Sequence, residues 1–497
     1  MRPIKTFVTT AAVLGLVAAG AAAAATSAPT ARKAVTAPYL VRMHESTQIK
    51  QILTVGEPVK KTSGGTYRMA GLPDGLGAFD NGDGTFTALI AHEINDTLGI
   101  ARAHGGIGAF VSKWVIKKDD LSIVSGEDLI KTVNLWTNGA YVATPGVKFS
   151  RFCSADLPAL SAFYNETSKL GFNGRLFLTG EEKGTEGRAF AHGIDGVSWE
   201  LPSLGKFSWE NALANWGTGD KTLVIGQDDA GGGKGQVYLY VGDKKASGNA
   251  VEQAGLTGGA LYGIAVKGFA AESSTSGIPD NTRFTLSKID NAIGKTGAEI
   301  EAASNTQLIT QFRRPEDGAW DPIKANVYYF VTTDAFPGRS RLWRLTFDDI
   351  TQPSLGGKID MLLDGTEGQQ MLDNIAVDKS GKRIMLQEDI GDQRSRGKIW
   401  MYNIPGDIVR NIVEHNDELF NPEKPGFITA DEETSGAIDM TDILGAGWFL
   451  LDDQVHGPTA PAGFTAPAKS GAFLDPELVE GGALFAVFIA PPKVAKA

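Results

Sequence analysis

The stretch GLGAFDNGDGTFTALIAHE, residues 75–93, contains two short runs of mostly apolar residues that are separated by an Asn/Gly/Asp turn and closed by an acidic residue. Such runs are typical of two antiparallel strands joined by a hairpin. A third apolar run, GAFVSKWVI at 108–116, follows after a loop. We interpret this succession of strand, turn, strand, acidic stop, loop and strand as one structural unit.

The same unit recurs along the chain, with further copies that begin near residues 159, 211, 318, 374 and 436. The copies are irregularly spaced, with long insertions after the first and third. Six sheet units of about 70 residues each fit a β-propeller. The sequence therefore predicts an all-β protein, a six-bladed β-propeller with loop insertions.

The N-terminus has the pattern of a secretory signal peptide. Arg2 and Lys5 precede an apolar run rich in Ala, Val and Leu, and small residues follow at Ala23 to Ala25. Because a twin-arginine pair is missing, we expect the general secretion route. We divide the chain into a signal peptide at 1–25, an N-terminal segment at 26–64 and a propeller domain at 65–492. We expect a secreted or periplasmic protein.

Charge and composition exclude several classes of partner. The formal net charge is −11, and no cluster of Lys and Arg stands out, so no nucleic-acid partner is expected. After the signal peptide no apolar run reaches the roughly 18 residues of a membrane span. Cys153 is the only cysteine, which leaves no internal disulfide. A closed propeller needs no partner chain, so we expect a monomer.

The acidic residues gather at corresponding points of the units. In an antiparallel hairpin the start of the first strand lies beside the end of the second, so both should face one mouth of the central channel. The second-strand ends are His92, Glu93, Glu181, Glu182, Asp228, Asp229, Asp334, Glu388, Asp389, Asp452 and Asp453. The first-strand starts are Asp74, Cys153, Asp156, Glu210, Glu316, Asp317, Asp373, Asn374 and Glu433.

Such a ring of carboxylates would repel itself without counter-charge, so it predicts bound cations. Oxygen donors favour hard ions such as Ca²⁺, Mg²⁺, Mn²⁺ or Fe³⁺, and the six histidines have no zinc-site spacing. Cys153 adds a soft donor that iron could use and calcium would not. The alternatives are a buried, inert Cys153 and a single calcium ion that only braces the blades. From the ring itself we predict Glu93, Asp229, Glu388 and Glu433 as ligands.

Two arginines, Arg313 and Arg314, precede Glu316 in QFRRPEDG. A guanidinium beside a metal cluster is suited to bind a phosphate through two hydrogen bonds and to stabilise charge that develops on it. Two metal ions could hold the attacking and leaving oxygens of a phosphoryl transfer. The alternative is that one arginine only pairs with ring carboxylates.

These residues resemble the PhoX-type alkaline phosphatases, a family of secreted β-propeller enzymes with an iron and calcium cluster in the channel. ALIAHE resembles the family's VNHE, LTGEE after Cys153 its TCEE, and GKFSWENA its GRF-x-HE. RRPEDG resembles its RPE, LDNIAVD its PDN, and DDQVHG its VQHPG. The chain departs from the family at Gly180, where the family has a second cysteine, and at Trp209, where it has a histidine.

The resemblance implies Cys153, Glu182, Glu210 and Asp373 as metal ligands, with Glu316 near calcium and Arg314 on the substrate phosphate. We therefore expect calcium and iron as cofactors and assign catalysis to Arg314 and Glu316. The leading hypothesis is a secreted, metal-dependent phosphatase that hydrolyses phosphate monoesters of small molecules with an alkaline optimum. The alternatives are a calcium-dependent lactonase-like or phytase-like hydrolase and a non-catalytic, calcium-braced binding propeller.

Overall fold

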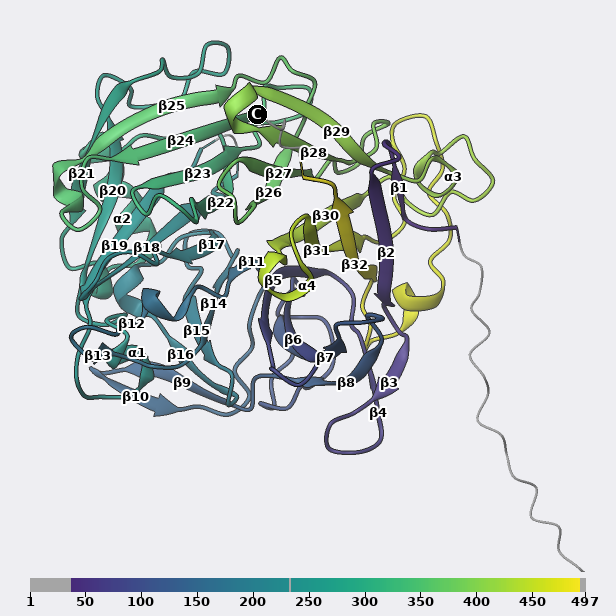
Figure 1. Cartoon of the computed structure of the whole chain (residues 1–497), viewed down its shortest axis with the longest axis horizontal. Coiled ribbons are helices and arrows are strands. Elements are labelled where there is room, and N and C mark those ends of the chain that lie inside the picture. The colour runs from purple at the N-terminus through teal and green to yellow at the C-terminus, as the bar shows by residue number, and fades with distance from the viewer. Residues whose placement is uncertain (1–36, 232–233, 492–497) are drawn as a thin grey trace, which may run out of the picture. The chain divides into compact units, whose positions relative to one another are not determined.

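Six blades, built mostly of antiparallel strand pairs, surround a central channel, and each begins with an innermost strand that lines the channel (Figure 1). The computed structural model describes residues 37–231 and 234–491, so the expected signal peptide lies outside the described residues. Neighbouring innermost strands contact one another in sequence, and the last, β30, contacts the first, β5. The circle is therefore closed, and the predicted six-bladed β-propeller is confirmed.

The blades are built as follows, from the channel outward. Blade 1 contains β5 (Pro73–Asp80), β6 (Thr85–His92), β7 (Phe110–Lys117) and β8 (Ile123–Asp128). Blade 2 contains β11 (Phe152–Asp156), β14 (Leu176–Glu181), β15 (Ala189–Gly193), β16 (Val197–Glu200), β9 (Thr132–Thr137) and β10 (Ala140–Ala143). Blade 3 contains β17 (Trp209–Ala214), β18 (Lys221–Asp228), β19 (Val237–Asp243), β20 (Ala260–Val266) and β21 (Thr282–Ile289).

Blade 4 contains β22 (Pro315–Trp320), β23 (Val327–Thr332), β24 (Arg341–Phe347) and β25 (Gly357–Leu363), and β25 also pairs with β21. Blade 5 contains β26 (Leu372–Val377), β27 (Arg383–Glu388), β28 (Lys398–Asn403), β29 (Ile408–His415) and β1 (Leu40–Arg42). Blade 6 contains β30 (Glu432–Asp439), β31 (Trp448–Val455), β32 (Gly481–Ile489) and β2 (Thr47–Thr54).

Small elements complete the fold. Two short hairpins are β3 (Pro58–Lys60) with β4 (Thr66–Arg68), and β12 (Tyr164–Asn165) with β13 (Leu170–Gly171). The helices are α1 (Ala250–Gln253), α2 (Gly297–Thr306), α3 (Asp417–Phe420) and α4 (Thr441–Leu444). In the described part of the chain no helix has the length and apolar character that a membrane crossing requires.

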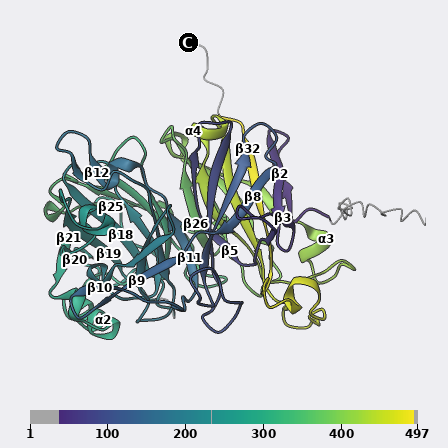
Figure 2. The same cartoon turned by 90° about the horizontal axis from the view of Figure 1, so that it is seen from below.

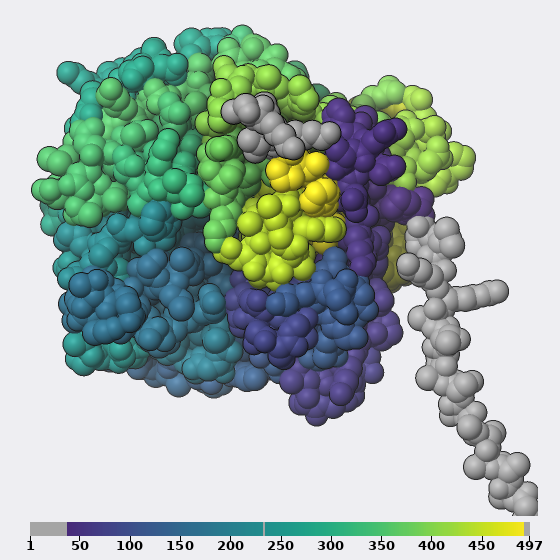
Figure 3. Space-filling model, viewed as in Figure 1, coloured from purple at the N-terminus to yellow at the C-terminus, as the bar shows by residue number. Residues whose placement is uncertain are grey.

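The N-terminal segment closes the propeller. Strand β2 pairs with β32 and β1 with β29, so strands from the start of the chain lie beside strands from its end (Figures 2 and 3). Leu40 and Leu53 are buried in these contacts. The sequence-based boundary at residue 65 falls after both strands, because their pairing joins residues more than 370 positions apart and leaves no local signal.

Apolar side chains fill the space between neighbouring blades. Each of the six pairs of adjacent blades encloses one cluster of buried residues, such as Trp343 between blades 3 and 4 and Phe190 between blades 1 and 2. Successive residues of a strand point to opposite faces, and here both faces are covered. This explains why strands such as β6 are apolar almost throughout instead of alternating with polar residues.

Candidate metal centre

A β-bulge recurs at the start of the innermost strand in five blades. In blade 1, Pro73 pairs with His92 and Leu76 with Ile90, so three steps on β5 match two steps on β6. A bulge re-aims the side chains of the residues it contains. The first bulged residue in blades 1 to 5 is Asp74, Cys153, Glu210, Glu316 and Asp373.

In blades 1, 2 and 5 the second strand of the hairpin contributes the residue just beyond its last paired position. The N–H groups of Glu93, Glu182 and Asp389 donate to the carbonyl groups of Leu72, Arg151 and Met371 over 2.8, 2.9 and 2.9 Å. Each of these accepting residues directly precedes an innermost strand. The hydrogen bond therefore fixes the acidic residue beside the bulge of its own blade.

Together these positions form four overlapping groups of possible metal ligands. In each group one ligand atom per residue lies within 4.8 Å of the others. The groups are Asp74, Glu93 and Cys153; Cys153, Glu182 and Glu210; Glu210, Glu316 and Asp373; and Asp373, Asp389 and Glu433. Because Cys153, Glu210 and Asp373 are each shared, the groups form a continuous chain around the channel mouth.

Burial and mutual repulsion dominate the electrostatics of this cluster. Burial, together with neighbouring carboxylates, raises the pKa of Asp74, Glu210 and Asp373 well above the usual range. Burial also raises the pKa of Glu182 to about 8 and that of Glu433 to about 7. Without cations these groups resist ionisation, so the cluster has the electrostatic character of a cation-binding site.

The donor atoms suit hard cations at most positions and a softer ion at one. Oδ1 of Asp74 and Oδ1 of Asp373 are buried and accept no hydrogen bond from residues 37–231 or 234–491. Such carboxylate oxygens fit calcium. Cys153 belongs to two of the groups, and burial raises the pKa of its thiol well above the usual range. A metal that binds there must displace this proton, as iron can and calcium does not.

Two arginines lie against the cluster. Arg314 places Nε 3.0 Å from Oδ1 of Asp229 and Nη2 2.9 Å from Oε1 of Glu316. Arg151 places Nε 2.7 Å from Oε1 of Glu93 and also pairs with Glu182. The alternative that an arginine pairs with ring carboxylates thus describes both Arg314 and Arg313, since Arg313 pairs with Asp334, which lies outside the four groups.

Arg151 was not predicted from the sequence, although it occupies the position in blade 2 that corresponds to Arg314 in blade 4. Arg151 and Arg314 each directly precede an innermost strand, and both have left-handed backbone conformations with φ of 45° and 57°. Non-glycine residues in this region are strained and often occur at functional sites. The side chains of Arg151 and Arg314 are 44% and 25% exposed.

Two of the nine predicted ligands, Asp229 and Glu388, lie outside the four groups. Asp229 is bound by Arg314. Glu388 accepts hydrogen bonds from the backbone N–H groups of Gln370 and Lys398 at 2.8 and 3.0 Å and from Nε1 of Trp400 at 2.8 Å. Asp389 takes part in its place, because successive side chains point to opposite faces.

The structure adds one histidine that sequence reasoning did not select. The N–H of His456 donates to the carbonyl of Asp431, which matches the arrangement in the other blades. Its Nε2 lies 3.6 Å from Oε2 of Glu433, and its Nδ1 lies 3.1 Å from Oε2 of Glu480. Although burial acts in the opposite direction, these two carboxylates raise the pKa of His456 well above its usual value.

The two residues that depart from the PhoX-type pattern lie in contact. A Cβ on Gly180 would lie 2.2 Å from Cβ of Trp209, so a side chain at position 180 would require the two strands to move apart. The ring of Trp209 also stacks on Phe207, with 3.9 Å between centroids. The indole therefore fills the space behind Glu210 with apolar surface.

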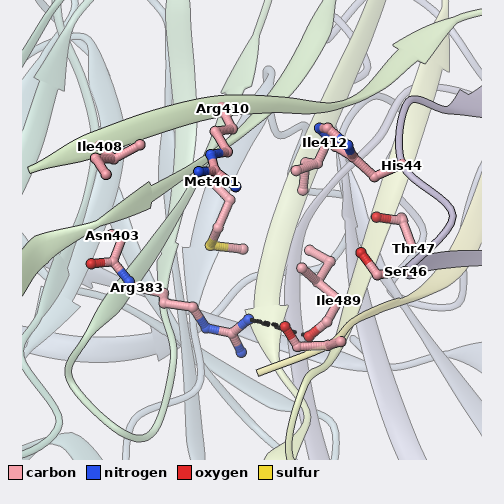
Figure 4. A pocket seen from close by; sticks show the side chains of 11 residues that line it. His44, Ser46, Thr47, Arg383, Met401, Asn403, Ile408, Arg410, Ile412 and Ile489 are labelled. Carbon is pink, nitrogen blue, oxygen red and sulfur yellow. Dashed lines mark hydrogen bonds between the residues drawn. The ribbon is translucent and has the colours of Figure 1, made fainter. Parts of the chain in front are cut away.

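Two other acidic residues of the predicted ring lie in the channel, away from the four groups. Asp156 and Asp317 line a cavity of about 220 Å³ that is bounded by the innermost strands of all six blades. A second hollow of about 420 Å³ lies at the outer edge of blades 5 and 6, lined by residues that include Met401, Ile412 and Arg383 (Figure 4). None of the predicted ligands lines this outer hollow.

This architecture defines a six-bladed propeller with a carboxylate-rich candidate metal centre at the channel mouth. No family model and no curated protein sequence matches the chain. Among solved structures it is similar to Pseudomonas fluorescens PhoX in complex with vanadate, a transition state analogue. The TM-score is 0.56 at 14% identity, over 91% of this chain and 96% of that one. It is less similar to the catalytic domain of Coprinopsis cinerea GH62 α-L-arabinofuranosidase, with a TM-score of 0.29 at 8% identity over 74% and 95%. The chain thus has a PhoX-like propeller fold.

Proposed function

We propose that this protein is a metal-dependent phosphoesterase that hydrolyses phosphate monoesters at the channel mouth. The observation that carries the proposal is the continuous chain of four carboxylate groups with two partly exposed arginines beside it. Such a site would hold several cations and an oxyanion together. The PhoX-like fold, in a neighbour that binds vanadate, supports the same chemistry.

Different residues of the site would bind the cations and the substrate. The carboxylates would hold calcium, and Cys153 with Glu182 and Glu210 would hold iron. The bound cations would activate water and neutralise charge on the phosphoryl oxygens. Arg314 would contact the phosphate, since its Nε and Nη2 are fixed by acidic partners while its Nη1 makes no hydrogen bond within the described residues. Glu316 would orient Arg314 and would help to hold the cations.

The proposal includes the cellular location and the oligomeric state of the protein. We propose that the mature protein is exported after removal of residues 1–25 and acts as a monomer on phosphorylated small molecules. The closed circle of blades supports the monomer, because the candidate site draws all its residues from one chain.

Metal analysis and turnover test this function together. Protein purified without chelator should contain calcium and iron and hydrolyse p-nitrophenyl phosphate, and EGTA should abolish turnover. Cys153→Ser should lose the iron. Calcium alone with lactone turnover would favour a lactonase-like hydrolase instead. Metal-loaded protein that hydrolyses no phosphate monoester would overturn the proposal.

A matched pair of variants tests the role of Arg314. Arg314→Ala should lower kcat/KM by about 100-fold, as expected when one donor to a transition-state oxyanion is removed. Arg313→Ala provides the control, because Arg313 is the adjacent residue and pairs with Asp334 outside the cluster. Equal losses in both variants would show that Arg314 has no special contact with the phosphate.

A further inference from the structure

Asp452 is an unusual buried carboxylate next to the candidate metal centre but outside it. Its side chain is 0% exposed, and neither Oδ1 nor Oδ2 accepts a hydrogen bond from residues 37–231 or 234–491. Asp452 belongs to none of the four groups. A buried carboxylate without any partner is costly, so its retention needs a cause.

Asp452 lies on a face of β31 that meets blade 1. Gln454 lies on the same face of β31 as Asp452, because side chains two residues apart share a face. This face meets blade 1, since Nε2 of Gln454 donates to Oδ2 of Asp74 over 3.3 Å and to Oε2 of Glu93 over 3.0 Å. Oε1 of Gln454 and Oδ1 of Asp74 are likewise buried without a hydrogen-bond partner among the described residues.

Gly436 lets blade 6 pack directly against blade 1 beside Asp452. Gly436 on β30 has φ of +57°, and a Cβ at this residue would lie 2.2 Å from the main-chain oxygen of Asp74 and 2.8 Å from Oδ1 of Asp452. Both oxygens therefore lie against the backbone of Gly436 in the seam between β30 and β5. A side chain at position 436 would collide with them.

We propose that a divalent cation of the calcium class binds in this seam between blade 6 and blade 1. Its ligands are the carboxylate of Asp452, the main-chain oxygen of Asp74 and Oε1 of Gln454. An all-oxygen set with a carboxylate and neutral carbonyl groups is typical of calcium. The ion ties the last blade to the first at the point where the propeller closes. The site does not contact substrate and is independent of the proposed phosphoesterase activity.

The neighbouring residue in the same strand differs from Asp452 in having a basic partner. Asp453 is also 0% exposed, but it points to the other face of β31, where its Oδ1 lies 2.6 Å from Nε2 of His415. Asp452 has no such basic partner. The pair Asp452 and Asp453 thus supplies a matched test of the cation site.

The experiment measures the calcium content of the holoprotein, together with the midpoint of thermal unfolding. Asp452→Asn should bind one calcium per chain less than the wild type, keep its iron and show a smaller rise of Tm with calcium. Asp453→Asn should keep the wild-type calcium content. If Asp452→Asn keeps the wild-type calcium content, Asp452 is a neutral buried acid and the proposal fails.

A second variant keeps the test valid if Asp452→Asn does not fold. The triple variant Glu93→Gln, Glu210→Gln and Asp373→Asn removes a carboxylate from each of the four groups while Asp452 stays intact. It should lose phosphatase activity and still bind one calcium per chain in equilibrium dialysis with calcium chloride. A triple variant that binds no calcium overturns the seam site, whatever the wild type does with phosphate esters.

Discussion

Adjacent carboxylates at the end of β27 have different partners, and this difference predicts opposite effects of mutation. Glu388→Gln should leave the metal content unchanged but lower the free energy of unfolding by about 1–3 kcal/mol, because an amide cannot accept all three hydrogen bonds of Glu388. Asp389→Asn should lose metal, since Asp389 belongs to a metal group, and should be as stable as the wild type once EGTA has stripped both proteins of metal. Metal analysis and denaturant unfolding of both variants measure the two quantities.

The two variants should differ in which property they lose, metal content or hydrogen-bonded stability. Loss of metal in Glu388→Gln, with full metal in Asp389→Asn, would mean that the roles of the two residues are exchanged. Loss in both would mean that the end of β27 acts as one unit, without the alternation of side chains.

Asp156 in the channel cavity predicts a dependence of stability on pH. Burial raises its pKa from 3.8 to about 7, although the N–H of Ala214 acts in the opposite direction at 2.8 Å from Oδ2. The folded state thus holds this proton more tightly than the unfolded state. Its contribution to stability is complete below pH 3.8 and is lost as the pH rises towards 7.

Asp156→Asn removes this titration while it preserves an acceptor for Ala214. The free energy of unfolding of the variant minus that of the wild type should therefore rise between pH 4 and 7, by at most about 1.4 kcal/mol per pH unit. Denaturant unfolding at saturating calcium measures the difference, which keeps the metal sites equally filled in both proteins. A difference that does not change with pH would contradict a raised pKa.

Much of the candidate site could be predicted at the residue scale because the hairpins repeat. The pairs Glu181–Glu182 and Glu388–Asp389 follow the same rule, with the second member at the channel mouth, and strict alternation along the strand would have selected Asp389. His456 could not be found in this way. Strand β30 begins three residues earlier relative to its bulge than the innermost strands of the other blades, so Glu433 pairs with Gln454 before the register shifts.

Strand β2 makes a prediction at the scale of the element. Leu53 is 1% exposed and packs in the apolar cluster between blades 6 and 1, with Leu484 and Phe86. Leu53→Ala should lower the free energy of unfolding by about 2–5 kcal/mol, through lost burial and the cavity left behind. Gln51→Ala on the exposed side of the same strand should change it by less than about 0.5 kcal/mol. Equal effects would mean that β2 is not part of the closing blade.

The elements of the blades were predictable because hairpin turns and apolar runs are local signals. The turn at Asp80–Gly84 and the runs on either side fix β5 and β6 without reference to the rest of the chain. The closing strands β1 and β2 carry no such signal, because their partners β29 and β32 lie near the other end of the sequence. Their assignment needs the closure of the whole circle of blades.

At the scale of the whole molecule, removal of the metals should destabilise every blade at once. The four groups take ligands from all six blades, so cations bound there connect the entire circle. An ion that binds only the folded state stabilises it by about 2.7 kcal/mol at 100 times its dissociation constant. EGTA should therefore lower the midpoint of a single cooperative transition in calorimetry, and excess calcium should restore it. An early separate transition on chelation would indicate that the cations hold only one or two blades, and an unchanged midpoint would indicate that the carboxylates are stable in the folded protein without any ion.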